Sequence, residues 1–132
     1  MALPNLYDAN RSSVLVNGQP VPGVRTIEFR QKRDQGQIYS LGQAERVGVY
    51  NGQLQVFGRI QIASAYPGLD TLAESTDSFD LLVMMGGAAG GRKVAFNECF
   101  IHDKSLSMGT GGHAETVYHF TATRMREEEG SA

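Results

Sequence analysis

The strongest structural signal in the sequence is a strict alternation of apolar and polar residues between Gln53 and Ala63. Leucine, valine, glycine and two isoleucines alternate there with three glutamines, a phenylalanine and an arginine. Successive side chains of a β-strand point to opposite faces, so this period of two predicts a long strand with one buried side. Such a strand needs further strands to cover its apolar side.

Glycines separate the other apolar runs and account for 16 of the 132 residues. Glycine adopts positive φ without steric cost, so most of these positions predict turns between strands. The predicted turns lie at Asn17-Gly18, Asn51-Gly52, Gly86–Gly91 and Gly109–Gly112. Gly58 differs, because it interrupts the apolar side of the long strand and predicts a bulge or a sharp bend there.

The predicted strands cover residues 13–16, 24–30, 46–50, 53–63, 79–85, 93–101, 105–108 and 115–126. The two Asn-Gly pairs predict hairpins that join the first strand to the second and the third to the fourth. The nearly continuous apolar run 79–85 predicts a central strand covered on both faces. A short helix is predicted to begin at Pro67, with Asp70 as its cap. The fold class is therefore all-β, a β-sandwich or barrel of about seven or eight strands with one short flanking α-helix.

The domain organisation follows from the same pattern. Residues 1–12 form an N-terminal arm with Leu3, Leu6 and Tyr7 as its apolar anchors, and residues 13–126 form the β domain. Residues 31–46 are polar without a clear period and predict an extended loop, while the acidic tail 127–132 is expected to fray. A loop of this length in a compact domain is usually functional.

Charge and cysteine content exclude several classes of protein. The net charge is −2, without the basic excess of proteins that bind nucleic acid through phosphate contacts. The basic residues between Arg25 and Arg33 are interspersed with acidic ones and fit a solvated surface better than a nucleic-acid site. The single cysteine allows no intramolecular disulfide, and no apolar run is long enough for a membrane helix. We expect no membrane partner.

Residues with catalytic or metal-binding chemistry are few. Cys99 and His102 have a zinc-like spacing, but a structural zinc site needs four ligands, and Cys99 is better explained as a small core residue. We predict no catalytic residue, no metal, no cofactor and no enzymatic activity. A small β-barrel that binds a ligand remains an alternative, although the chain has no tryptophan to line such a pocket.

The polar side of the long strand suggests assembly. Glutamine is uncharged, so this side carries little charge. A strand with so little charge is poorly protected against pairing with other chains. The extended loop and the N-terminal arm likewise contain apolar residues that a neighbouring subunit could order.

In the order of its strands and turns, the chain resembles phage tail tube proteins from Ser13 to Arg126. The matching segments are 14–21, 24–30, 47–52, 56–62, 94–101, 105–108 and 117–123. The resemblance implies a β-barrel or sandwich flanked by one helix. It also implies a structural protein of the virion tail, assembled in the host cytoplasm, in which six copies form a ring and the rings stack into a tube. Sheath, baseplate and terminator proteins would be its partners, and DNA would pass through the lumen without specific binding.

The resemblance also implies roles for individual residues. Lumen-facing candidates are Gln53, Gln55, Arg59 and Gln61. Inter-ring candidates in the extended loop are Lys32, Asp34, Ile38, Tyr39, Leu41 and Glu45, and arm candidates for inter-subunit contact are Leu3, Leu6 and Tyr7. Arg59 suits a DNA-conducting lumen only if an acidic residue pairs with it, because free cations bind phosphate. A baseplate or terminator ring and a type VI secretion tube share this fold and stay open as alternatives.

Overall fold

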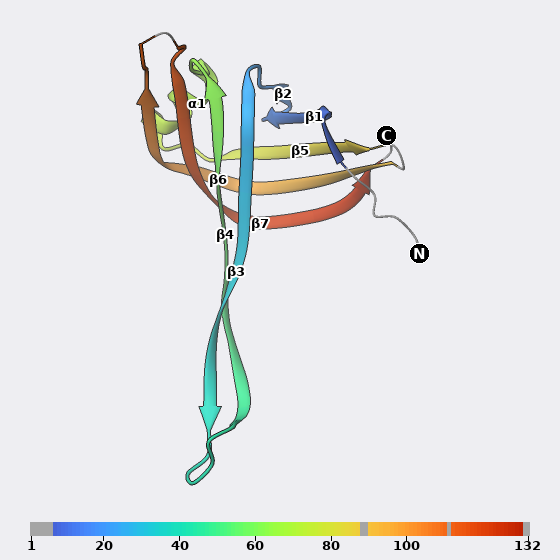
Figure 1. Cartoon of the computed structure of the whole chain (residues 1–132), viewed down its shortest axis with the longest axis vertical. Helices are drawn as coiled ribbons and strands as arrows, with labels where there is room; N and C mark the ends of the chain where they lie inside the picture. Colours follow the sequence, from blue (N-terminus) through green and yellow to red (C-terminus); the bar gives the residue numbers. More distant parts are fainter. Residues whose placement is uncertain (1–6, 88–89, 111, 131–132) are drawn as a thin grey trace.

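The computed structural model describes residues 7–87, 90–110 and 112–130, which form one antiparallel sheet and one helix (Figure 1). The strands are β1 (Tyr7–Val16), β2 (Gln19–Pro20), β3 (Val24–Tyr39), β4 (Arg46–Ala63), β5 (Phe79–Gly87), β6 (Gly91–Ser107) and β7 (Glu115–Gly130), and the helix is α1 (Pro67–Ser75). The predicted all-β class with one short helix is confirmed. No helix in the described part of the chain is long and apolar enough to span a bilayer.

The strand order of the sheet is β2-β1-β5-β6-β7-β4-β3. The long strands β6 and β7 curve, so the sheet folds into two halves that run in different directions (Figure 1). The first part of β6 pairs with β5 and with the end of β7, whereas residues 101–107 pair with the start of β7. That start of β7 also pairs with β4, so one half consists of β2-β1-β5-β6-β7 and the other of β6-β7-β4-β3.

A β-bulge at Glu98 lies in β6 between these two halves. Glu98 has a φ of 51°, and the register of the β5–β6 ladder shifts between Phe79 and Leu81. The Glu98 amide donates a hydrogen bond to the Asp80 carboxylate, and the Thr123 hydroxyl donates one to the Glu98 carbonyl. Bulges bend the strand that carries them, which accounts for the change in direction of β6.

The hydrophobic core lies between the two halves. Three phenylalanines join them through edge-to-face contacts: the ring centroid of Phe96 is 5.1 Å from that of Phe29 and 5.6 Å from that of Phe120. Val56, Ile60 and Ile62 of β4 are buried beside Tyr118, Phe120, Phe79, Leu81, Val83, Val94 and Leu69 of α1. The alternation predicted for the long strand is therefore confirmed at Val56, Ile60 and Ile62, whereas Leu54, predicted on the same side, is exposed because it lies where β4 leaves the core.

Gly58 does not form a bulge, contrary to the prediction. The ladders of β4 with β3 and with β7 run through it without a shift in register. A Cβ atom at this position would lie 2.4 Å from the Glu28 carbonyl oxygen and 2.8 Å from the ring of Phe120. The position needs glycine because the Glu28 carbonyl of β3 and the Phe120 ring both approach its backbone too closely to leave room for a Cβ atom.

The hairpins differ from those predicted. The Asn17-Gly18 turn is present, with positive φ at both residues, but it joins β1 to the two-residue strand β2. Residues 24–30 belong to β3 and pair with β4 instead. The Asn51-Gly52 turn is absent, since 46–50 and 53–63 are parts of one strand. The tertiary register decides here, because Asn51 pairs with Gln35 on β3 and cannot turn back on its own strand.

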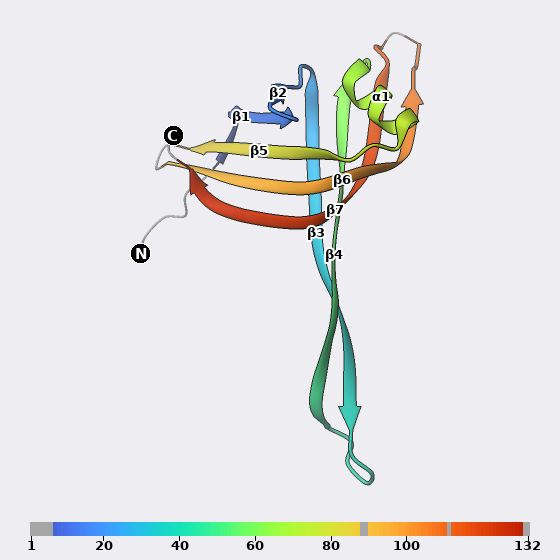
Figure 2. The same ribbon diagram turned by 180° about the vertical axis from the view of Figure 1, so that it is seen from behind.

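The segment predicted as an extended loop is also mostly strand. Residues 31–39 continue β3 and pair with the first part of β4, so only residues 40–45 form a turn. Its polar composition hid the strand period, because both faces of this part of the hairpin are exposed to solvent. Figures 1 and 2 show the resulting hairpin extending away from the sheet.

Further corrections concern the ends of elements. The predicted strands 93–101 and 105–108 form the single strand β6, and β7 continues through residues 127–130 of the predicted frayed tail. An ion pair between Arg92 and Glu127 joins this last part of β7 to β6. Strand β5 is central in the sheet, but only alternate side chains are buried. Asp70 is not the helix cap: Tyr66 occupies that position, and Pro67 begins the helix as predicted.

Candidate assembly surface

The half-sheet β6-β7-β4-β3 presents one surface to solvent, on the side opposite the core. This surface is called the polar face and contains Thr26, Glu28, Arg30, Phe57, Arg59, Gln61, Glu115, Val117, His119 and Thr121. These residues alternate along their strands with the buried Val56, Ile60, Tyr118 and Phe120. The polar face therefore follows directly from the two-residue period of each strand.

An ion pair lies at the centre of the polar face. Glu28 and Arg59 are opposite each other in the β3–β4 ladder. The Arg59 guanidinium donates two hydrogen bonds to the Glu28 carboxylate, at 3.0 and 3.1 Å. Hydrogen bonding to Arg59 and its positive charge lower the pKa of Glu28, so the carboxylate stays ionised. The acidic partner that the sequence argument required for Arg59 is present.

A second cluster surrounds Glu115 at the start of β7. Its carboxylate accepts hydrogen bonds from Gln61 at 2.5 Å and from Arg25 at 2.8 Å, and His113 lies 3.2 Å away. The pKa of Glu115 is lowered, chiefly by the Gln61 hydrogen bond and also by the charge of Arg25. Both arginines of these clusters are therefore held by ionised carboxylates.

The predicted lumen residues fall into two places. Arg59 and Gln61 belong to the polar face, whereas Gln53 and Gln55 lie beyond the last β4–β7 pair, on the part of β4 that leaves the sheet. The acidic partners Glu28 and Glu115 were not among the candidates. Strand register would have identified them, because only the β3–β4 and β4–β7 pairings bring them to Arg59 and Gln61.

The two outer strands of this half of the sheet have unpaired edges. Strand β3 pairs only with β4, and it is the last strand of the sheet. Within the described residues, β5 pairs with β6 only as far as Cys99, so residues 100–107 of β6 have a ladder on the β7 side alone. An unpaired strand edge is a template for pairing with another chain.

The projecting hairpin carries all the predicted inter-ring residues. They are all exposed: Lys32, Asp34, Ile38, Tyr39, Leu41 and Glu45. Ile38 packs across the ladder on Gly48, and the Tyr39 hydroxyl donates a hydrogen bond to Gln37. A two-stranded hairpin is only marginally stable in water, so contacts from outside the chain are expected to support it.

Of the predicted arm residues, only Tyr7 lies within the described part of the chain. It begins β1 and is opposite Gly87 of β5, so the sheet includes residues that were assigned to a loose arm. Leu3 and Leu6 lie outside the described residues.

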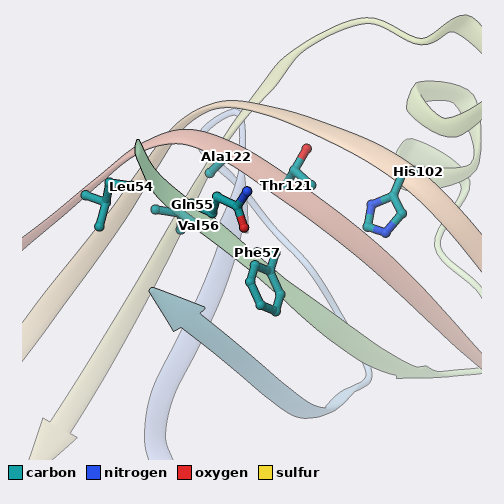
Figure 3. A pocket seen from close by; sticks show the side chains of 7 residues that line it. All are labelled: Leu54, Gln55, Val56, Phe57, His102, Thr121 and Ala122. Atoms are coloured by element: carbon teal, nitrogen blue, oxygen red, sulfur yellow. The ribbon is translucent and has the colours of Figure 1, made fainter. Parts of the chain in front are cut away.

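A pocket of about 450 Å³ lies where β7 curves away from β4 (Figure 3). It is lined by residues of β4, β6 and β7, namely Leu54, Gln55, Val56, Phe57, His102, Thr121 and Ala122. His102 faces this pocket, whereas Cys99 is completely buried in the core and burial raises its pKa to about 12. The described residues contain no group of three or more potential metal ligands.

Comparison with known proteins gives structural matches only. No protein-family model matches the chain, and no curated protein matches its sequence. The tail tube of phage SPP1 superposes with a TM-score of 0.74 at 8% identity, over 96% of this chain and 81% of the other. The tube-terminating cap of the anti-feeding prophage gives 0.71 at 11% identity, over 98% and 95%. Hcp1 from Flavobacterium johnsoniae gives 0.57 at 11% identity, over 92% and 98%.

These similarities extend over nearly the whole chain, and the proteins concerned are a tail tube, a tube-terminating cap and Hcp1. At this level of identity the comparison shows the fold. The chain adopts the fold of phage tail tube and Hcp-type tube proteins.

Proposed function

We propose that the protein is a structural subunit of a phage tail tube and has no enzymatic role. Copies form hexameric rings, the rings stack, and DNA passes through the lumen. The main support is the half-sheet β6-β7-β4-β3, in which the outer edges of β3 and of residues 100–107 of β6 have no ladder within the described residues, and which carries the polar face. Edge-to-edge association of such half-sheets closes a ring in which no strand edge remains exposed.

The charges of the polar face suit passage of DNA. Arg59 is held by the ionised carboxylate of Glu28, and Arg25 of β3 is held by that of Glu115, whereas Arg30 of the polar face has no ion pair with any of the described residues. Guanidinium groups that are already paired offer less attraction to phosphate, so DNA slides instead of binding. The chain is in that case located in the virion tail, with sheath, baseplate and terminator proteins as partners of the tube.

A terminating ring is the second candidate, because the fold also matches the anti-feeding prophage cap. The two functions differ in polymerisation. A tube subunit adds rings without limit, whereas a terminator stops at a single ring. Negative-stain microscopy and light scattering over a range of protein concentrations separate them.

The projecting hairpin provides a matched variant. Replacing residues 33–54 by an Asn-Gly turn closes the hairpin at the Lys32–Gln55 pair and leaves both edges of the half-sheet intact. The full chain is expected to form tubes and the shortened chain single rings, with circular dichroism confirming that it is folded. Monomers alone at every concentration and salt condition would contradict the proposed function.

A further inference from the structure

Exposed large apolar side chains are concentrated in two groups within the described residues. The hairpin group consists of Ile38, Tyr39, Leu41, Val47, Val49 and Tyr50. The β6-end group consists of Leu106 and Met108, which are 60% and 75% exposed. Leu54 and Phe100 are also exposed, nearer the body of the sheet. Exposed apolar groups of this kind mark surfaces that contact other proteins.

The two groups lie at opposite ends of the molecule. The hairpin tip forms one end of the long axis, and the connection between β6 and β7 lies at the other end (Figures 1 and 2). Strand β4 alone has 18 residues, so at about 3.3 Å per residue the separation is roughly 60 Å. One chain therefore cannot bring its hairpin tip onto its own Leu106 and Met108.

We propose that Leu106 and Met108 receive the hairpin tip of a second copy, with Leu41 as the inserted side chain. The inference rests on the proposed function and identifies the surface on which one ring holds the next. Contact between two different ends of identical chains is heterologous and repeats along an axis. Every copy except those at the ends of the assembly buries both of its apolar groups.

Two other arrangements leave Leu106 and Met108 exposed. A symmetric contact between two hairpin tips gives a closed dimer and leaves Leu106 and Met108 exposed in both copies. In the second, the tip instead enters the pocket between β1 and β3, which Val21, Val24 and Met85 line. Ser13 also lines this pocket. The two alternatives predict different cross-links.

The test is disulfide cross-linking of the full-length protein carrying Leu41→Cys and Met108→Cys. Mild oxidation with copper phenanthroline converts two thiols that lie close together into a disulfide, and this requires Cβ atoms about 3.5–4.5 Å apart. Cys99 does not interfere, because its side chain is completely buried. The control variants are each single substitution and the pair Leu41→Cys with Ser13→Cys.

The double variant is expected to give a ladder of cross-linked chains on a non-reducing gel, because each copy can react at both ends. Each single variant is expected to stay monomeric on the gel. Dimers from Leu41→Cys alone, or a ladder from the Ser13 pair in its place, would overturn the inference. Stacked rings by microscopy without the Leu41–Met108 cross-link would overturn it and leave the proposed function standing, whereas monomers alone would overturn both.

Discussion

The ion pair between Glu28 and Arg59 at the centre of the polar face allows a direct test of the proposal that DNA passes without binding. The Glu28→Gln substitution removes the negative charge next to Arg59 and keeps the shape of the side chain. Both partners are largely exposed, with side-chain exposures of 58% and 44%, and exposed ion pairs contribute little to stability. We therefore expect the variant to fold and assemble like the original protein.

The expected gain in DNA binding follows from the number of cations released. Glu28→Gln frees one guanidinium per copy, and each phosphate contact adds about 0.9 to the slope of log K against log salt. Between 50 and 200 mM salt, one added contact makes the affinity fall by roughly a further 3.5-fold. In the proposed ring of six copies, the added slope is multiplied by the number of subunits that contact the duplex.

Fluorescence anisotropy with a labelled duplex at 50, 100 and 200 mM salt measures this change. Glu74→Gln is the matched control, because it removes the same charge from the exposed end of α1, away from the polar face. The double variant Glu28→Gln with Arg59→Gln is expected to lose the gain. Equal binding by the Glu28 and Glu74 variants, or a gain that survives loss of Arg59, would refute the reasoning.

Three further predictions concern the fold. Gly58→Ala places a Cβ 2.8 Å from the Phe120 ring, and overpacking of this kind costs about 1–3 kcal/mol in urea unfolding; unchanged stability would contradict the packing argument. Burial alone would raise the pKa of Asp70, but hydrogen bonds, including one from Lys104, outweigh it and the pKa is lowered. The ionised carboxylate therefore stabilises the folded state above pH 3.8, and this stabilisation is lost as the pH falls through the folded-state pKa. Asp70→Asn should therefore be less stable than the original protein at pH 7, by about 1 kcal/mol, and equal to it in strong acid. Cys99, with a pKa of about 12, should react with a thiol reagent at pH 8 only after unfolding.

Prediction from the sequence succeeded where a segment has one buried and one exposed side. The alternation of Val56, Ile60 and Ile62 and the apolar runs of β5 and β7 identified strands correctly, although only alternate side chains of β5 are buried. It failed on the hairpin, because both of its sides are exposed and no period of two separates buried from exposed residues there. The Asn51-Gly52 pair then suggested a turn in the middle of what is a continuous strand.

The candidate site was predicted in part for a similar reason. The strand pattern identified Arg59 and Gln61 as outward-facing residues, and the structure places both on the polar face. Their carboxylate partners Glu28 and Glu115 lie 31 and 54 positions away from them in the sequence. Nothing local in the sequence specifies such a distance, because it depends on which strands pair and in which register.

The sequence by itself determined the all-β class and the side of the long strand that faces the core. The tertiary structure decided which strands are neighbours, where β6 bends, which edges stay unpaired and how far the β3–β4 hairpin projects. Local periodicity reports only whether a side chain faces the core. Pairing between distant segments is selected by the packing of the whole core, here by the contact of Phe29, Phe96 and Phe120 across the two halves of the sheet.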